Sequence, residues 1–414
     1  WGDGDQFGFS IALSGDGNVL AAGALSEDSR ASGINNTKFE NDDTAPDAGA
    51  VYIFTRSGNT WTQRDYLKSS NNDQGDRFGF SLALSANGNT LVASSYDEGG
   101  SGRGVNTIPD NLRGGSGAAY VFERANANDS WRQTTYLKGS QSNRNDALGV
   151  AVEISEDGNT IVIGRADDTC LVAGINAPCR ESTWPPHLGA GSAGAAYVWV
   201  RSGNTWVEQA FLKATNPDLE DLFGVRVAIS ADGNTIVAGA NDEDSLLTGV
   251  PSNDQGARDA VRDTSAGAAY VFARDGGGKW AQQVWLKAIN TQKNDQFGTS
   301  VSISGDGNTV AVGSMFGPGP AASKGVNSDP NDDTQTGSGS VYLYTRSGAT
   351  WTPAAYVKAP NARTSAQFGN AVGLSADGKT LAVGSVRETS SAKGINGNQP
   401  HTSAPEAGAA YLFY

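Results

Sequence analysis

Carboxylates are the side chains of this sequence best suited to chemistry, and the chemistry to be considered is the binding of a hard cation. Oxygen-bearing side chains occupy alternate positions at Ser14, Asp16 and Asn18, a spacing that calcium ligands also use. Aspartates cluster again in two longer polar segments. The candidate metal ligands are Asp16, Asn18, Asp42, Asp43, Asp47, Asp332 and Asp333. The competing interpretations, which we favour over calcium, are a plain hairpin turn at Asp16 and solvated surface charge in the clusters.

The two cysteines, Cys170 and Cys179, lie in one segment of the chain. They lack the Cys-x-x-Cys spacing of metal and redox motifs. We therefore predict a local disulfide that restrains a long loop, with two free thiols as the alternative. Because structural disulfides persist in oxidising surroundings, this bond would imply an oxidising compartment.

No catalytic constellation is recognisable in the sequence. The two histidines, His187 and His401, each stand alone, and no Gly-x-Ser-x-Gly, His-Glu-x-x-His or phosphate-cradling motif occurs. In five places an aspartate stands two residues before a repeated apolar position, and its ability to bond its own backbone predicts turn capping. These aspartates are Asp5, Asp76, Asp146, Asp221 and Asp295. The sequence does not predict an enzyme.

An internal repeat of about 70 residues determines the elements that position these side chains. Its opening phrase begins at Phe7 and returns at Phe78, Leu148, Phe223, Phe297 and Phe368. The units span approximately residues 1–68, 69–138, 139–213, 214–287, 288–358 and 359–414. A repeat of this kind is one supersecondary unit that buries its apolar surface against the next copy.

Each unit is predicted to be a four-stranded antiparallel meander. An alternating strand, 78–84, is joined to 91–93 by a turn containing Asn87-Gly88, and Asp-Gly takes that place in the other units. A second polar turn, 56–60, joins the third strand to the fourth. Repeated four-stranded sheets predict a β-propeller. The expected fold is all-β, a single propeller domain over residues 1–414 with six blades, or seven as the alternative.

The sixth unit stops after Tyr411-Leu412-Phe413-Tyr414, at the end of its third strand. We therefore predict that the last blade lacks its outer strand. An exposed sheet edge is rarely left unprotected, so upstream residues missing from the sequence, which we favour, or a neighbouring chain would supply a strand.

Long connections join the second strand to the third, as in residues 25–48, 241–266 and 315–338. The turns between strands one and two and between three and four are short. In a meander these two classes of connection lie on opposite faces. We expect the long, often acidic loops to form the functional face, because binding residues concentrate on loops.

The repeated residues resemble FG-GAP repeats, the units of the integrin α-subunit propeller and of many bacterial secreted proteins. Phe-Gly recurs at 7–8, 78–79, 223–224, 297–298 and 368–369. A second signature, Gly33-Ile34-Asn35, returns in four other units and resembles the bacterial branch. The resemblance implies a propeller over the whole chain. Integrin-type blades often carry a calcium loop of the Asp-x-Asp-x-Asp-Gly kind, whereas this chain has Ser-x-Asp-Gly-Asn there.

Charge limits the classes of partner. With 30 basic and 44 acidic residues the net charge is −14, which repels phosphate backbones and argues against nucleic acid. No apolar run reaches the ~18 residues that a membrane-spanning helix needs.

The loops and the resemblance together predict a non-catalytic binding or adhesion module. We expect it to be extracellular or at the cell surface, with the periplasm as an alternative, and to bind a protein or glycan through the long loops. The alternative functions are a structural subunit of a larger extracellular assembly and an extracellular hydrolase with polar groups converging in its channel.

Overall fold

The computed structural model describes residues 4–36, 38, 42–179, 191–251, 264–317, 325–331, 334–397 and 403–414. Their regular structure is β-strand, and none of them belongs to a helix long and apolar enough to cross a membrane. The chain divides into two compact units, Trp1–Lys213 and Ala214–Tyr414. This division coincides with the expected boundary between the third and fourth repeats. The single-domain assignment stays a prediction.

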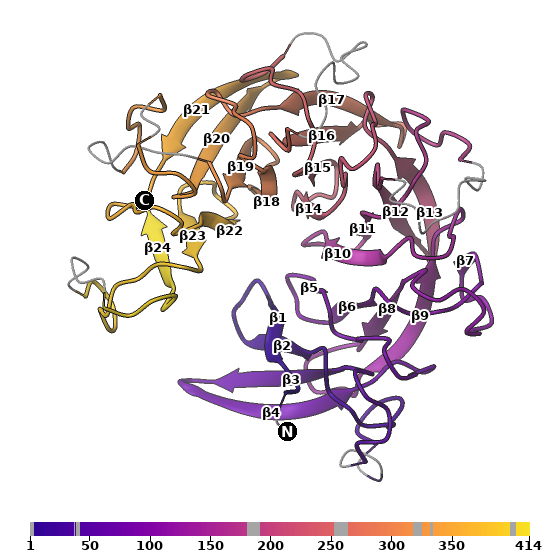
Figure 1. Cartoon of the computed structure of the whole chain (residues 1–414). Coiled ribbons are helices and arrows are strands. Elements are labelled where there is room, and N and C mark those ends of the chain that lie inside the picture. The colour runs from indigo at the N-terminus through magenta and orange to yellow at the C-terminus, as the bar shows by residue number, and fades with distance from the viewer. Residues whose placement is uncertain are drawn as a thin grey trace. The chain divides into compact units, whose positions relative to one another are not determined.

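The first unit contains three antiparallel sheets, which run from indigo to magenta in Figure 1. Their orders are β1-β2-β3-β4, β5-β6-β8-β9-β7 and β10-β11-β12-β13, so chain neighbours are sheet neighbours except at β7. The strands are β1 (Phe7–Leu13), β2 (Val19–Ala24), β3 (Ala50–Ser57), β4 (Thr60–Leu67), β5 (Leu82–Leu84), β6 (Thr90–Ser95), β7 (Gly104–Val105), β8 (Ala118–Glu123), β9 (Arg132–Lys138), β10 (Leu148–Ile154), β11 (Thr160–Arg165), β12 (Ala195–Ser202) and β13 (Thr205–Leu212). The two-residue β7 is an addition to the predicted meander, formed where a long loop returns to the edge of β9.

The second unit holds the other three sheets, with orders β14-β15-β16-β17, β18-β19-β20-β21 and β22-β23-β24. The strands are β14 (Arg226–Ile229), β15 (Thr235–Ala240), β16 (Ala268–Arg274), β17 (Trp280–Leu286), β18 (Phe297–Ile303), β19 (Thr309–Ser314), β20 (Ser340–Ser347), β21 (Thr350–Val357), β22 (Phe368–Leu374), β23 (Leu381–Ser385) and β24 (Ala409–Phe413). The predicted fold class is confirmed: all-β, six propeller blades, and three strands in the last. The described residues form six sheets and not the seven of the alternative.

The turns between first and second strands are closed by their own side chains. In the first blade the Asp16 carboxylate accepts hydrogen bonds from the Ser14 hydroxyl at 2.6 Å and from the Asn18 backbone N–H at 2.9 Å. Gly17 has a φ of 66°, which glycine adopts without a steric penalty. The Ser14 bond, followed by the bonds from Asn18, lowers the pKa of Asp16. The predicted hairpin is therefore present.

Successive blades within a unit approach closely at the glycine that precedes the third strand. Gly49 has a φ of 80° and forms a parallel bridge with the fully buried Phe78 of the next blade. A Cβ added to Gly49 would overlap the Phe78 carbonyl oxygen. The same overlap would occur at Gly117, Gly267 and Gly339. A side chain at these positions is therefore excluded both by φ and by space.

In several blades a buried lysine at the end of the fourth strand pairs with a carboxylate at the start of the preceding loop. Lys68 is inaccessible to solvent, and its Nζ lies 2.6 Å from Glu27 Oε2. In the second blade Lys138 Nζ lies 2.8 Å from Glu98 Oε2. Lys287 pairs with Glu243 in the same way in the fourth blade. Burial lowers the pKa of Lys68, and the Glu27 carboxylate opposes that shift.

The repeated aspartates cap the connections between blades, as predicted. The Asp76 carboxylate accepts a hydrogen bond of 3.0 Å from the Asp73 backbone N–H, and Asp146, Asp221 and Asp295 accept equivalent bonds. Asp76 is 4% exposed, and burial raises its pKa to about 7. The nearby Glu98 carboxylate adds to that rise.

The close approach of blades predicts that Gly49→Ala is strongly destabilising. The methyl group would meet the Phe78 carbonyl and the residue would be strained at positive φ, so we expect a loss of about 3 kcal/mol or more in the free energy of unfolding. Gly58→Ala is the matched control, since Gly58 has a φ of 59° but nothing within 4 Å of the added Cβ, and should lose only about 1 kcal/mol. Urea unfolding of both variants measures the difference. Equal losses would contradict the steric argument.

The raised pKa of Asp76 predicts a pH-dependent contribution to stability. Its carboxyl titrates near pH 4 in the unfolded chain and near 7 in the folded one, so the stabilisation is complete below about pH 4 and is lost as the pH rises through 7. Asp76→Asn removes this loss. The stability of the variant relative to the unaltered protein should therefore increase from pH 4.5 to pH 8, by roughly 3 kcal/mol.

Urea unfolding at several pH values tests this prediction, since titrations common to both proteins cancel in the difference. The exposed Asp43 gives the matched control, Asp43→Asn, which should show no such trend. A difference between Asp76→Asn and the unaltered protein that stays constant with pH would show that Asp76 has an ordinary titration.

Candidate binding face formed by the long loops

The candidate site is the face formed by the connections between second and third strands, which we call the long loops. They comprise residues 25–49, 96–117, 166–194, 241–267, 315–339 and 386–408. In the first unit they lie beside the connections between blades: the Gly75 backbone N–H donates to the Pro46 carbonyl at 2.9 Å. In the second unit the Ser365 N–H donates to the Thr336 carbonyl at 3.0 Å. Both kinds of connection therefore share one face within each unit.

In blades that have a fourth strand, the long loop is fastened to the edge of its own sheet by a short motif, which we call the hook. In the first blade the hook is Gly33-Ile34-Asn35: the Lys68 N–H donates to the Gly33 carbonyl at 2.8 Å, and Ile34 bridges Leu67. The Asn35 side-chain oxygen accepts from the Tyr66 N–H at 2.8 Å. Equivalent hooks pair at Val105, Ile175 and Val326. A hook therefore acts as an additional edge strand that fixes the base of the loop.

The long loop of the second blade is braced along its length. The Asp110 carboxylate accepts hydrogen bonds from the Ser101 backbone N–H at 2.7 Å and from the Ser101 hydroxyl at 2.6 Å. These bonds, the hydroxyl first, lower the pKa of Asp110. Asn111 Nδ2 reaches Asp73 at 2.9 Å, and Arg113 Nη1 reaches the Ser142 carbonyl at 2.8 Å. The loop is thus connected to the interblade connections before and after it.

This braced loop carries two large apolar side chains that face solvent. Ile108 is 87% exposed and Leu112 is 78% exposed. In the second unit the fourth blade's loop presents Leu246 and Leu247, at 49% and 42%. Because solvent-exposed apolar groups on an ordered loop can be buried by a partner at little entropic cost, these residues are suited to binding.

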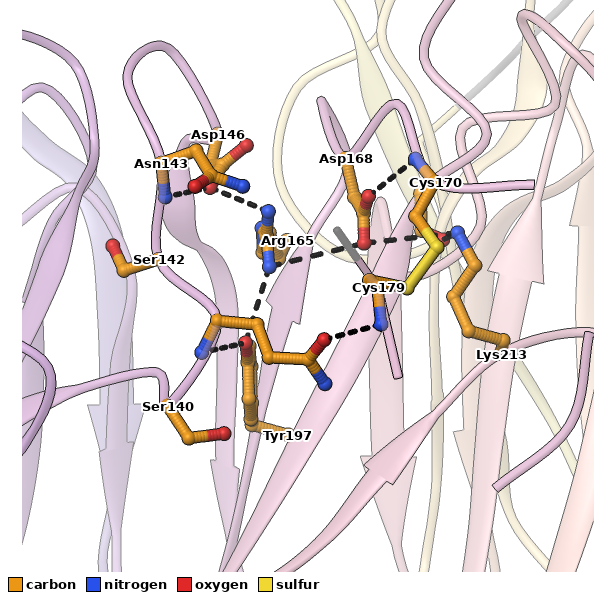
Figure 2. Close-up of polar contacts among 12 residues, drawn as sticks. Ser140, Ser142, Asn143, Asp146, Arg165, Asp168, Cys170, Cys179, Tyr197 and Lys213 are labelled. Atoms are coloured by element: carbon orange, nitrogen blue, oxygen red, sulfur yellow. Dashed lines mark hydrogen bonds and ion pairs between the residues drawn. A yellow bond between two sulfur atoms is a disulfide. The ribbon is translucent and has the colours of Figure 1, made fainter. Parts of the chain in front are cut away.

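The long loop of the third blade is constrained by the predicted disulfide. Figure 2 shows the Cys170–Cys179 bond beside Asp168, whose carboxylate accepts from the Cys170 N–H at 2.6 Å. Nearby, the buried Arg165 guanidinium lies 2.5 Å from Asp146 and 3.8 Å from Asp168. Burial disfavours the charge of Arg165, but Asp168 and Asp146 outweigh this and raise its pKa. The disulfide prediction is confirmed.

The predicted metal ligands do not converge in the part of the chain that the structure describes. Asp42 forms an ion pair of 2.7 Å with Arg30, and Asp43 is exposed. Asp47 donates its backbone N–H to Asp28. Around Asp16, the Asn18 side-chain amide donates to the carboxylate at 3.0 Å, which presents a donor where a cation needs an acceptor.

No group of three or more acidic, histidine or cysteine side chains is arranged for a metal within the described residues. Asp332 and Asp333 lie outside those residues, as do His187 and His401. Calcium binding therefore stays a prediction.

One cavity, of about 310 Å³, borders the long loop of the fifth blade, which lines it with Asn327, Ser328 and Pro330 beside apolar and aromatic groups such as Tyr342 and Pro353. Another, of about 910 Å³, lies beside a turn between third and fourth strands. There Arg201 pairs with Glu123 at 2.5 Å, and Arg124 stacks on Trp131 with its guanidinium 4.6 Å from the ring centre. At this cavity the charges of Arg201 and Glu123 thus neutralise each other, and the Arg124 guanidinium supports packing.

Sequence reasoning missed two features of this face. The Gly-Ile-Asn signature was visible as a repeat, but its role as a hook depends on pairing across about 30 residues of chain. Ile108 and Leu112 lie in an irregular polar segment, where periodicity gives no signal. Their exposure could be seen only in the structure.

Comparison with known proteins gives one family and several fold-level likenesses. A family model for the FG-GAP repeat matches residues 280–344, which run from β17 to β20. No functionally curated protein matches the sequence. The chain is similar to a putative 6-phosphogluconolactonase from Bacteroides uniformis, with 12% identity and a TM-score of 0.49, covering 98% of this chain and 88% of that one.

Two further structures show a comparable likeness. The periplasmic gluconolactonase PpgL of Pseudomonas aeruginosa has 10% identity and a TM-score of 0.46, covering 98% of this chain and 88% of that one. The WD40 repeats of RRP9 have 10% identity and a TM-score of 0.41, covering 100% and 96%. At these identities the likeness concerns the fold alone, and the activities named for those proteins are theirs.

The family match covers about one period of a repeat that occurs six times in the chain. Each period folds into one propeller blade. The match and the six blades together support an FG-GAP propeller family.

Proposed function

We propose that this FG-GAP propeller is a non-catalytic binding module that engages a protein ligand through its long loops. The observation that carries the proposal is the braced loop of the second blade, which holds Ile108 and Leu112 in solvent. An aliphatic pair of this kind suits a protein surface better than a glycan, which is bound mainly by aromatic and polar groups. A glycan ligand is the alternative outcome of the test below.

The electrostatic character of the chain supports a partner with a basic surface. The net charge of −14 attracts cationic surfaces and speeds their encounter with the loops. The Cys170–Cys179 disulfide supports an oxidising location, either extracellular or periplasmic. We therefore place the binding event outside the cytoplasm.

The proposal predicts that the double substitution Ile108→Ser, Leu112→Ser weakens ligand binding by roughly 30- to 1,000-fold, because each side chain contributes about 1–2 kcal/mol of apolar burial and 1.4 kcal/mol is a tenfold change in affinity. Binding would be measured on arrays of extracellular proteins and of glycans, followed by interferometry on each hit. The thermal stability of the variant should be unchanged, since both side chains are exposed.

Val207→Ser is the matched control for this experiment. Val207 is 48% exposed, but it lies in β13 and not in a long loop, so its substitution should leave affinity unchanged. Binding that survives the double substitution but is lost in Val207→Ser would place the site away from the long loops.

A further inference from the structure

The second, third and fourth blades share a polar clamp between the fourth strand and the connection that precedes the blade. In the second blade the Gln133 side-chain oxygen accepts from the Ser70 backbone N–H at 3.0 Å, and Gln133 Nε2 donates to the Ser70 hydroxyl at 2.8 Å. The other clamps are Gln282 with Thr215 and Glu208 with Ser140. Each clamp thus places a carboxamide or a carboxylate against a backbone N–H of the connection.

The fifth blade has neither partner of this clamp. Ile289 takes the place of the clamp serine, two residues after the strand-ending lysine, and Pro353 takes the place of Gln133. In their sheets, Pro353 and Gln133 lie opposite equivalent aromatic residues of the third strand. Neither an isoleucine nor a proline side chain can donate or accept a hydrogen bond. The fifth blade therefore lacks the polar contact that joins these two segments in the second to fourth blades.

The cavity of about 310 Å³ lies where this clamp is missing. Its walls include Ile289, Ser328, Tyr342, Tyr344, Pro353 and Tyr356. None of the described residues that line it carries a charge. Because an apolar cavity of about 150 Å³ is enough to bind benzene, this one has room for a substituted aromatic ring. Its volume also lies at the lower end of the range found for small-molecule pockets.

The aromatic wall of the cavity is preformed. The Tyr342 hydroxyl donates to Asn290 Oδ1 at 2.7 Å, and the Tyr344 hydroxyl donates to the Lys287 carbonyl. The ring centres of Tyr342 and Tyr356 are 5.2 Å apart. Because these rings are already fixed by their own contacts, a ligand that packs against them loses little binding energy to the ordering of side chains.

Two polar groups at the cavity have no hydrogen-bond partner among the described residues. One is the Ile289 backbone N–H, the counterpart of the N–H that donates to Gln133 in the second blade. The other is the hydroxyl of Ser328, a long-loop residue that is 7% exposed. A buried hydroxyl without a partner costs stability that a bound hydrogen-bonding group would recover. Because the second and fourth blades satisfy the N–H with a carboxamide, the same group is the best match for the fifth.

We propose that the fifth blade binds a small, uncharged aromatic carboxamide in this cavity. The ring would occupy the volume between Pro353 and the tyrosine wall, and the carboxamide oxygen would accept from the Ile289 N–H. The amide N–H groups would be donors for the Ser328 hydroxyl. A carboxylate is a poorer match, because none of the described lining residues is a cation that would offset its burial. This site is separate from Ile108 and Leu112, which lie in the loop of another blade.

Three probes of similar shape test the proposal on the full chain. Saturation-transfer NMR should show saturable binding of p-toluamide. The anion p-toluate should bind at least about tenfold more weakly, because its buried charge has no compensating cation. The hydrocarbon p-xylene lacks the carbonyl and should also bind about tenfold more weakly, because the Ile289 N–H then stays without an acceptor.

Protein variants locate the site. The double substitution Ile289→Thr, Pro353→Gln recreates the clamp of Thr215 with Gln282, so it should weaken p-toluamide binding at least about tenfold while the protein stays folded. Ile289→Trp fills the cavity from a side chain that is 37% exposed, and it keeps the test decisive if the double variant does not fold.

The matched control is the double-serine variant of the second blade's loop, which should bind p-toluamide as the unaltered protein does. The proposal is overturned by the absence of saturable p-toluamide binding, by equal affinity for p-toluamide and either other probe, or by unchanged p-toluamide affinity when the clamp is restored or the cavity is filled.

Discussion

The buried ion pair between a fourth-strand lysine and a loop carboxylate is the interaction on which this architecture depends. Lys68 and Glu27 illustrate it: both are shielded from water, and 41 residues of chain separate them. Removing either partner would leave an uncompensated buried charge. This costs far more stability than replacing both residues with apolar ones of similar volume. The pair therefore commits the last strand of the meander and the beginning of the long loop to one relative position.

Two other contacts are arranged around that pair. The hook fixes the loop against the outer edge of the sheet, and the glycine before the third strand fixes the end of the loop against the next blade. In the first blade these are Asn35 and Gly49, and each uses a positive φ that regular strands do not adopt. Because carboxylate, hook and glycine all lie in or beside the loop, the loops are as much a part of the framework as the strands.

Much of the fold could be predicted from the sequence because its determinants are local and repeated. Asp-Gly turns, alternating strands and a period of about 70 residues indicate six meanders without any knowledge of long-range contacts. The Cys170–Cys179 pair could likewise be inferred from proximity in sequence. Each of these signals can be read from the sequence without a structure.

The candidate site could be predicted only in outline, because its determinants are long-range. A lysine at the end of a strand is expected to be exposed, and nothing in Tyr66-Leu67-Lys68 indicates that its charge is buried against Glu27. Of the acidic residues predicted as candidate metal ligands, Asp42 forms a local ion pair with Arg30, a contact that the sequence alone does not indicate. The exposed pair Ile108 and Leu112 has no periodicity, so its importance depends on bracing contacts made by Asp110 and Arg113.

The separation of hook and glycine along each loop has an evolutionary consequence. In the first blade the chain between Asn35 and Gly49 starts and ends at fixed points, so its length and composition can change while the sheet keeps its register. Lengthening such a segment costs little, since closure entropy grows only with the logarithm of loop length. A blade with both contacts is thus a frame that accepts insertions without refolding, and a series of such frames allows one scaffold to diversify its surface at several positions.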